Sequence, residues 1–168
     1  MVTFKRLMAV ALLIALAAAG VWYFMFYRSD EAVIGRRIDK FETLLTKSPG
    51  SGGSAEALAN LQLSGMIADG CEVREIHPLI DGVYSPTAFA SLVSQGHAAC
   101  DRIEVEFDHE DIKLTAPASA TITLEASVEA KLKGGDKQED NRDLIIKMKK
   151  VDDDWKIASI TAPPMLKD

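Results

Sequence analysis

The stretch ASATITLEASVEAKL, residues 118–132, decides the fold of this chain. From Ile122 to Leu132 every second residue is apolar, and each residue between two apolar ones is polar or charged. Successive side chains of a β-strand point to opposite faces of a sheet. The alternation therefore predicts a long strand with one buried face and one face in water.

The residues after this strand predict its antiparallel partners. The polar segment 134–141, GGDKQEDN, predicts a hairpin tip, and residues 144–151 alternate again as a return strand. Asp152-Asp153-Asp154 predicts a tight turn before a last strand that starts at Trp155 and ends at Pro163. Upstream, residues 102–114 predict a further strand with an acidic bend at 108–111.

Three helices are predicted before these strands. Apolar residues at helical spacing mark residues 30–47, which Ser29 or Asp30 can cap, and a second helix is predicted over 55–67. Pro86 follows a capping Ser85 and predicts a third helix that runs to Gly96 or Ala99. A short strand over 71–76 lies between the second and third helices. This order predicts an α+β domain over residues 30–162, with three helices packed on a curved antiparallel sheet and a tail over 163–168.

An apolar segment precedes the domain. Residues 7–27 contain no charged side chain, and a bilayer core needs roughly 20 such residues in a helix. We therefore expect a transmembrane anchor over 7–27, which would make the membrane the first partner of the chain. The alternative is a cleaved secretory signal with its cleavage site at Ala17–Ala19. The short basic tail, residues 1–6, favours a cytoplasmic N-terminus and a periplasmic or extracellular domain in a single-pass protein.

Charge excludes one class of partner. All 25 acidic residues lie at or after Asp30, whereas three of the 19 basic residues precede it, so residues 30–168 carry a net charge of −9. Such a surface has no footprint for nucleic acid. His77, His97 and His109 show no metal-ligand spacing with the two cysteines, and we expect neither a metal nor another cofactor.

The two cysteines, Cys71 and Cys100, leave two alternatives open. In an oxidising compartment an even pair can form a disulfide, whose loop would contribute on the order of 3–4 kcal/mol. The other alternative is two buried free thiols, because cysteine is among the most buried residue types.

The order of elements resembles the NTF2-like superfamily, a cone-shaped fold that includes scytalone dehydratase, ketosteroid isomerase and the SnoaL-like proteins. The resemblance covers residues 30–161 and rests on the long first helix, the strand near 71–76, the helix at Pro86, the hairpin over 118–151 and the late turn with Trp155-Lys156-Ile157. It is a resemblance of order and spacing. Because this fold hosts many functions, function has to be argued from a site.

The resemblance implies a pocket at the wide end of the cone. Residues of suitable type for it are Asp69, His77 and Tyr84, followed by Asp81, His97 and Asp101. Most of these positions are at predicted turns, where Asp is favoured for its backbone hydrogen bonds alone, and His97 suits the C-terminal end of a helix. We therefore treat Asp69, His77 and Tyr84 as ligand-pocket candidates and assign no catalytic residue.

Three functions compete at this stage. The first, which we favour, is a membrane-anchored, non-enzymatic interaction or scaffold domain with envelope protein partners; the resemblance implies self-association as a homodimer through the sheet face. The second is a binder of a small apolar ligand, and the third is an isomerase or dehydratase that uses the cone pocket. A closed aliphatic interior would favour the first, and an open cavity with convergent polar groups the others.

Overall fold

A computed structural model describes the chain over residues 14–16, 20, 29–48 and 53–163. Within these ranges, no helix is long and apolar enough to cross a membrane. Several sequence-based predictions lie outside the described residues: the tail 1–6, all of the anchor 7–27 except residues 14–16 and 20, the loop at 49–52, and the C-terminal tail after Pro163.

Three predicted helices of the domain are confirmed. They are α2 (Asp30–Leu45), α3 (Ser54–Met66) and α4 (Pro86–Ala99). Ser29 caps α2 by accepting a hydrogen bond from the backbone N–H of Ala32, and Ser85 caps α4 in the same way from Ala88. Helix α2 ends two residues earlier than predicted, because the backbone of Lys47 pairs with Ile103 of the sheet.

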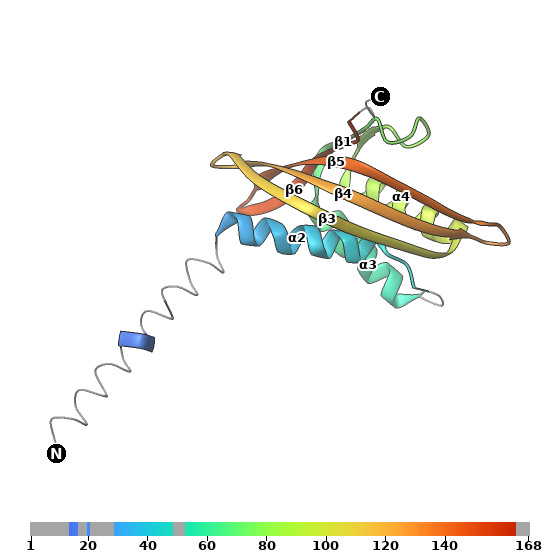
Figure 1. The fold of residues 1–168 in the computed structure, drawn as a ribbon, viewed down its shortest axis with the longest axis horizontal. Helices are drawn as coiled ribbons and strands as arrows, with labels where there is room; N and C mark the ends of the chain where they lie inside the picture. Colours follow the sequence, from blue (N-terminus) through green and yellow to red (C-terminus); the bar gives the residue numbers. More distant parts are fainter. Residues whose placement is uncertain (1–13, 17–19, 21–28, 49–52, 164–168) are drawn as a thin grey trace, which may run out of the picture.

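One six-stranded sheet forms the other layer. Its strands are β1 (Ile67–Arg74), β2 (Gly82–Tyr84), β3 (Cys100–Ala116), β4 (Ser119–Leu132), β5 (Lys137–Val151) and β6 (Asp154–Thr161). Their order across the sheet is β2-β1-β6-β5-β4-β3. Figure 1 shows the long strands β3, β4 and β5 curving across the molecule with the helices on one side. The predicted α+β class is confirmed.

The prediction of a purely antiparallel sheet is wrong in one respect. Strand β1 pairs antiparallel with β2 but parallel with β6, so the sheet is mixed. Alternation of apolar residues shows that a strand has a buried face, but it carries no information on the direction of its neighbour. Strand β1 also starts at Ile67, four residues before the predicted start, and Gly70 adopts a φ of 73° where the register with β6 shifts.

The long strands follow the predicted alternation. Residue Ile122 of β4 lies opposite Ile112 of β3 and Ile146 of β5, on the inner face of the sheet. The predicted acidic bend at 108–111 is a bulge within β3, where His109 adopts a φ of 54°. Asp152 and Asp153, both with positive φ, form the tight turn between β5 and β6.

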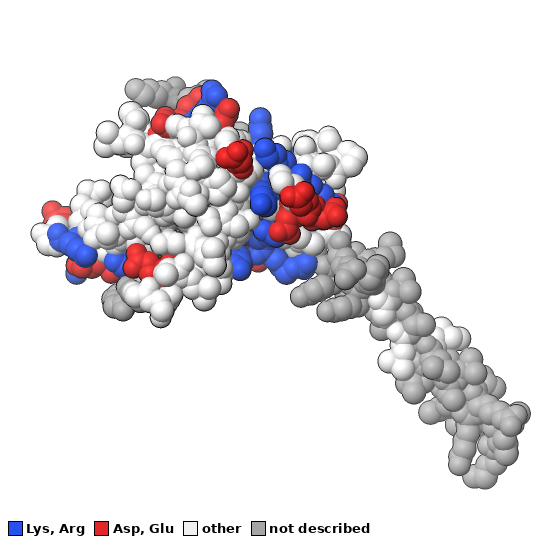
Figure 2. Space-filling view, turned by 180° about the vertical axis from the view of Figure 1, so that it is seen from behind, with Lys and Arg blue, Asp and Glu red and all other residues white. Residues whose placement is uncertain are grey.

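The core lies between the inner sheet face and the helices. Ile34, Ile38 and Phe41 of α2 are buried in one cluster with Ile122 and Ile146. The part of the helix layer formed by α3 and α4 is poor in charge, since these two helices carry a single acidic residue, Glu56, and no Lys or Arg. Figure 2 shows the molecule from behind the view of Figure 1, and large parts of this face have no charged side chain.

Candidate ligand cavity

A cavity opens between the sheet and the helices at one end of the core. Its volume is about 470 Å³, within the range of about 300–1,000 Å³ that is usual for small-molecule sites. Residues from α2, α4, the strands and the loop between β1 and β2 form its wall: Phe41, Leu45, Val73, Ile76, Ile80, Phe89, Leu92, Val93, Gln95, Gly96, His97, Ile103, Val105, Phe107, Ala126, Val128, Leu144 and Ile160.

The cavity exists because the strands are longer than the helix that covers them. The 16 residues of α2 span about 24 Å, whereas the 14 residues of β4 span about 47 Å. Phe41, one turn before the end of α2, packs against Phe89 and Phe107 with ring centroids 6.2 Å apart. Beyond this aromatic group the chain follows the edge strand β3, where Lys47 pairs with Ile103. It leaves the inner face of β4 open, and Ala126 and Val128 of this face line the cavity.

The loop over residues 75–81 closes part of the open end. The carboxylate of Asp81 accepts hydrogen bonds from the backbone N–H groups of Glu75, Ile76 and His77 at 3.0–3.1 Å. Arg142 of β5 donates to the carbonyl of Ile76 at 2.6 Å. These bonds fix the loop so that Ile76 and Ile80 face the cavity.

His97 is the only titratable side chain among the described lining residues. Its Nε2 lies 2.8 Å from the carbonyl oxygen of Leu45. Because a carbonyl oxygen can only accept, Nε2 carries the proton, and the neutral ring then has its acceptor at Nδ1. Lys47 supports this corner by donating to the carbonyls of His97 and Cys100, the latter at 2.8 Å.

The three pocket candidates from the sequence do not line the cavity. Asp69 is exposed on β1, and His77 is exposed in the 75–81 loop, where its Nδ1 accepts from the N–H of Leu79. Tyr84 comes nearest: its ring packs edge-on against Phe89, which does line the cavity, but its hydroxyl donates to the carbonyl of Ile80 at 2.7 Å. His77 and Tyr84 therefore bond to the backbone of the loop before β2.

Of the three remaining candidates, two lie away from the cavity and one lines it. Asp81 fixes the loop, and Asp101 is exposed at the start of β3. His97, which the sequence placed at a helix C-terminus without a functional role, is the one that reaches the cavity. Its position in sequence gave no sign of this, because the contact depends on how α4 packs against the end of α2.

Cys71 and Cys100 are both buried and are not bonded to each other. They lie on β1 and β3, which three other strands separate in the sheet. Burial raises the pKa of the Cys71 thiol to about 11, so this thiol stays protonated and weakly nucleophilic at neutral pH. Across the described part of the chain, no group of His, Cys, Asp and Glu side chains has the arrangement of a metal site.

Comparison with known proteins gives likeness of structure alone. No protein-family model and no curated protein matches the chain. A putative scytalone dehydratase from Novosphingobium aromaticivorans superimposes with a TM-score of 0.64 at 13% identity, covering 79% of this chain and 82% of that one. For the Kfla4162 protein from Kribbella flavida the TM-score is 0.66 at 10% identity, with 83% and 93% covered.

A third structure is the hexachlorocyclohexane dehydrochlorinase LinA-type3 from Novosphingobium barchaimii. Its TM-score is 0.62 at 11% identity, and the match covers 79% of this chain and 84% of that one. The fold is NTF2-like. At these identities the likeness extends to the backbone of the NTF2-like domain and not to any site residue, so function rests on the cavity itself.

Proposed function

We propose that the NTF2-like domain binds a small, uncharged and largely apolar molecule in its cone cavity. The observation that carries the proposal is the lining: apart from Gln95 and His97, its side chains are aliphatic or aromatic. Burying an ionised group without a partner is costly, and no Lys, Arg, Asp or Glu lines the cavity within the described residues. The site therefore favours a hydrocarbon-rich ligand without a formal charge.

Binding without chemistry fits this lining better than catalysis. An elimination or isomerisation requires a proton acceptor beside the substrate. His97 is the only side chain of this kind in the described lining. Its Nε2 donates to the carbonyl of Leu45, so only its Nδ1 is left as an acceptor, and no carboxylate lies in the cavity to assist it. The putative dehydratase and the dehydrochlorinase among the structural neighbours share the cone, and their residues do not transfer to this chain at 11–13% identity.

The placement at a membrane is a second part of the proposal and rests on the sequence of residues 7–27. If this segment anchors the chain, α2 begins three residues after it, at Asp30. The cavity lies at the opposite end of α2, about 22 Å away along the helix axis, because Phe41 and Leu45 belong to its wall. An exported, anchored domain would then present its ligand site away from the start of α2, where envelope partners could deliver or receive the ligand.

The test is a titration of the full-length chain, in phospholipid nanodiscs, with the uncharged fluorophore N-phenyl-1-naphthylamine. We expect saturable fluorescence enhancement above that of empty nanodiscs, and displacement by unlabelled uncharged hydrocarbons such as naphthalene. A sulfonated analogue of the fluorophore should bind at least about tenfold more weakly, because its charge would be buried without a partner. A linear, non-saturable signal equal to that of empty nanodiscs would contradict the proposal.

A further inference from the structure

A basic hollow lies beside α2, at the end of the domain where this helix begins. Its volume is about 460 Å³, and residues of α2, α3 and the start of β6 form its wall. Three of these residues are cationic, Arg36, Arg37 and Lys40, whereas Asp154 is the only acidic residue in the described lining. Figure 2 shows Lys and Arg side chains gathered at this end of the domain, next to a group of acidic side chains.

The cations of the basic hollow are placed so that they can hold one anionic group together. Arg36 and Lys40 are four residues apart on α2 and therefore lie side by side on its surface. Arg37 pairs with Asp154 at 2.6 Å, which orients its guanidinium at the hollow. Lys40 is exposed and, among the described residues, forms no ion pair. Arginine guanidinium and lysine ammonium groups are the usual protein ligands of phosphate.

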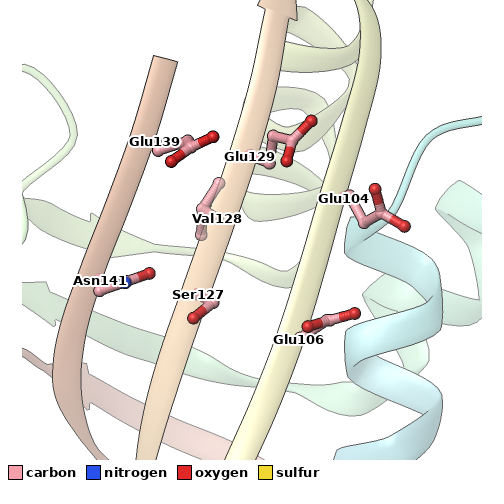
Figure 3. A pocket seen from close by; sticks show the side chains of 7 residues that line it. All are labelled: Glu104, Glu106, Ser127, Val128, Glu129, Glu139 and Asn141. Atoms are coloured by element: carbon pink, nitrogen blue, oxygen red, sulfur yellow. The ribbon is translucent and has the colours of Figure 1, made fainter. Parts of the chain in front are cut away.

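The opposite end of the long strands is acidic. Figure 3 shows a second, acidic hollow of about 300 Å³, which is lined by glutamates from three adjacent strands: Glu104, Glu106, Glu129 and Glu139. Lys137 offsets part of this charge by pairing with two of them. Lys150 bonds to Asp30 at the start of α2 and lies eleven residues after Glu139 on β5, about 37 Å along the strand. The basic and the acidic hollow therefore lie at opposite ends of the domain.

We propose that the basic hollow binds the phosphate of an anionic phospholipid headgroup, in the membrane that holds the chain. This inference rests on the membrane placement proposed above for residues 7–27. In that placement Arg36 lies six residues into α2, about 9 Å along the axis from its first residue. Long Lys and Arg side chains reach towards the membrane–water interface from such positions, and anionic headgroups attract them.

A headgroup suits this hollow better than a free phosphate ion. Residues 30–168 carry a net charge of −9, so the domain as a whole repels dissolved anions. Headgroups beside an anchored domain are instead present at a high effective concentration, and a few charged contacts are then enough for binding. The anionic surface would repel the acidic hollow at the same time, so the two hollows together would orient the domain with its acidic end away from the bilayer.

The test is lysine footprinting of the full-length chain in two kinds of nanodisc. One contains phosphatidylcholine alone, whose choline cation offsets its phosphate, and the other an equal mixture with anionic phosphatidylglycerol. The rate of acetylation by N-hydroxysuccinimide acetate is measured for each lysine by mass spectrometry. Lys40 should react at least about threefold more slowly with phosphatidylglycerol present, because an amine that donates to a phosphate keeps its proton. Lys133, exposed between β4 and β5 at the acidic end, is the control and should not change.

A pair of variants at Gly65 ties the footprint to the basic hollow. Gly65 lines it from α3, and a Cβ at this position would meet no atom within 4 Å apart from the adjacent backbone. Gly65→Glu therefore adds a negative charge to the hollow without removing any side chain, and it should abolish the effect of phosphatidylglycerol on Lys40. Gly65→Gln has the same length without the charge and should keep it. An effect retained in Gly65→Glu, or one shared by Lys133, would overturn the proposal.

Inorganic phosphate distinguishes the two sources of the bound group. Added to phosphatidylcholine nanodiscs, and compared with sodium chloride at equal ionic strength, it should leave the acetylation of Lys40 unchanged. Slowing by inorganic phosphate alone, or equal rates for Lys40 in both kinds of nanodisc, would overturn the assignment to a headgroup. A chain that does not co-purify with nanodiscs would overturn it together with the membrane placement. Binding of N-phenyl-1-naphthylamine in the cone cavity is a separate measurement and is independent of all these outcomes.

Discussion

At the scale of single residues, Asp30 links the first helix to the last strand. Its carboxylate accepts hydrogen bonds from Lys150 at 2.7 Å and from the indole N–H of Trp155 at 2.9 Å. These bonds, first that from Lys150 and then that from Trp155, hold the pKa of Asp30 below its usual value. Trp155 is only 1% exposed, so its N–H depends on this partner.

Replacing Asp30 by alanine should lower the free energy of unfolding by about 1–3 kcal/mol, because the buried indole N–H would have no acceptor. Chemical denaturation at pH 7 measures the change. Glu31→Ala, one residue further along the same helix turn, is the matched control and should cost at most about 0.5 kcal/mol. Equal losses in the two variants would show that the indole bond contributes little.

The pKa of Glu110 is shifted in the opposite direction to that of Asp30. Partial burial against neighbouring parts of the chain, followed by the carboxylates of Asp39 and Glu42, raises the pKa of Glu110. A raised pKa in the folded state means that the ionised form destabilises the fold, and that this penalty disappears as the pH falls through the raised pKa towards the ordinary value of 4.5.

Glu110→Gln should therefore stabilise the fold at pH 7.5 and have no effect near pH 4. We expect a gain of at most about 0.5 kcal/mol, because the side chain is largely exposed and solvent screens the repulsion. Unfolding curves of both proteins across this pH range measure the difference. A gain that grows as the pH is lowered would have the wrong sign for this account.

At the scale of elements, the loop over residues 75–81 is held by one side chain. Asp81→Ala removes the acceptor of three backbone N–H groups, at residues 75, 76 and 77. Hydrogen bonds to a charged group are worth about 1.5–3 kcal/mol. We expect these three amides to exchange with deuterium at least about tenfold faster, while the amides of β4 are unchanged. Asp136→Ala, at the β4–β5 hairpin tip, should leave loop exchange as it is.

The sequence was informative about elements that have their own periodicity or caps. The alternation in residues 118–132 and the caps at Ser29 and Ser85 predicted β4, α2 and α4, because these signals are local. The three-residue strand β2 was missed because it is too short to show a pattern. The parallel pairing of β1 with β6 was missed because periodicity does not encode pairing direction.

The cavity could not be predicted from the sequence, because its lining residues carry no local signal either. Polar residues at predicted turns were chosen as site candidates because of their residue type. In the structure, Asp81 and Tyr84 instead form hydrogen bonds with the backbone of their own loop. The cavity is instead made of apolar residues, such as Phe41 and Val128, which in sequence are indistinguishable from the core. Only the difference in length between α2 and the long strands makes them a site.

At the scale of the whole molecule, the domain has an apolar interior site and two unlike outer surfaces. The cavity lies on the helix side of the sheet, and a shallow hollow lined by Glu104, Glu106, Glu129 and Glu139 lies on the opposite side. Val128 of β4 borders both hollows. Variants on alternate residues of β4 can therefore alter the cavity and the outer face independently.

The measurement that tests the central claim most directly is probe binding to a pair of neighbouring variants. Ala126 of β4 is buried and lines the cavity, whereas Ser127 points to the outer sheet face. Ala126→Leu should lower the affinity for N-phenyl-1-naphthylamine by at least about tenfold, because the larger side chain would occupy space in the cavity that the ligand needs. Ser127→Leu should bind like the parent chain. Equal saturable binding by all three proteins would contradict the assignment of the cone cavity as the ligand site.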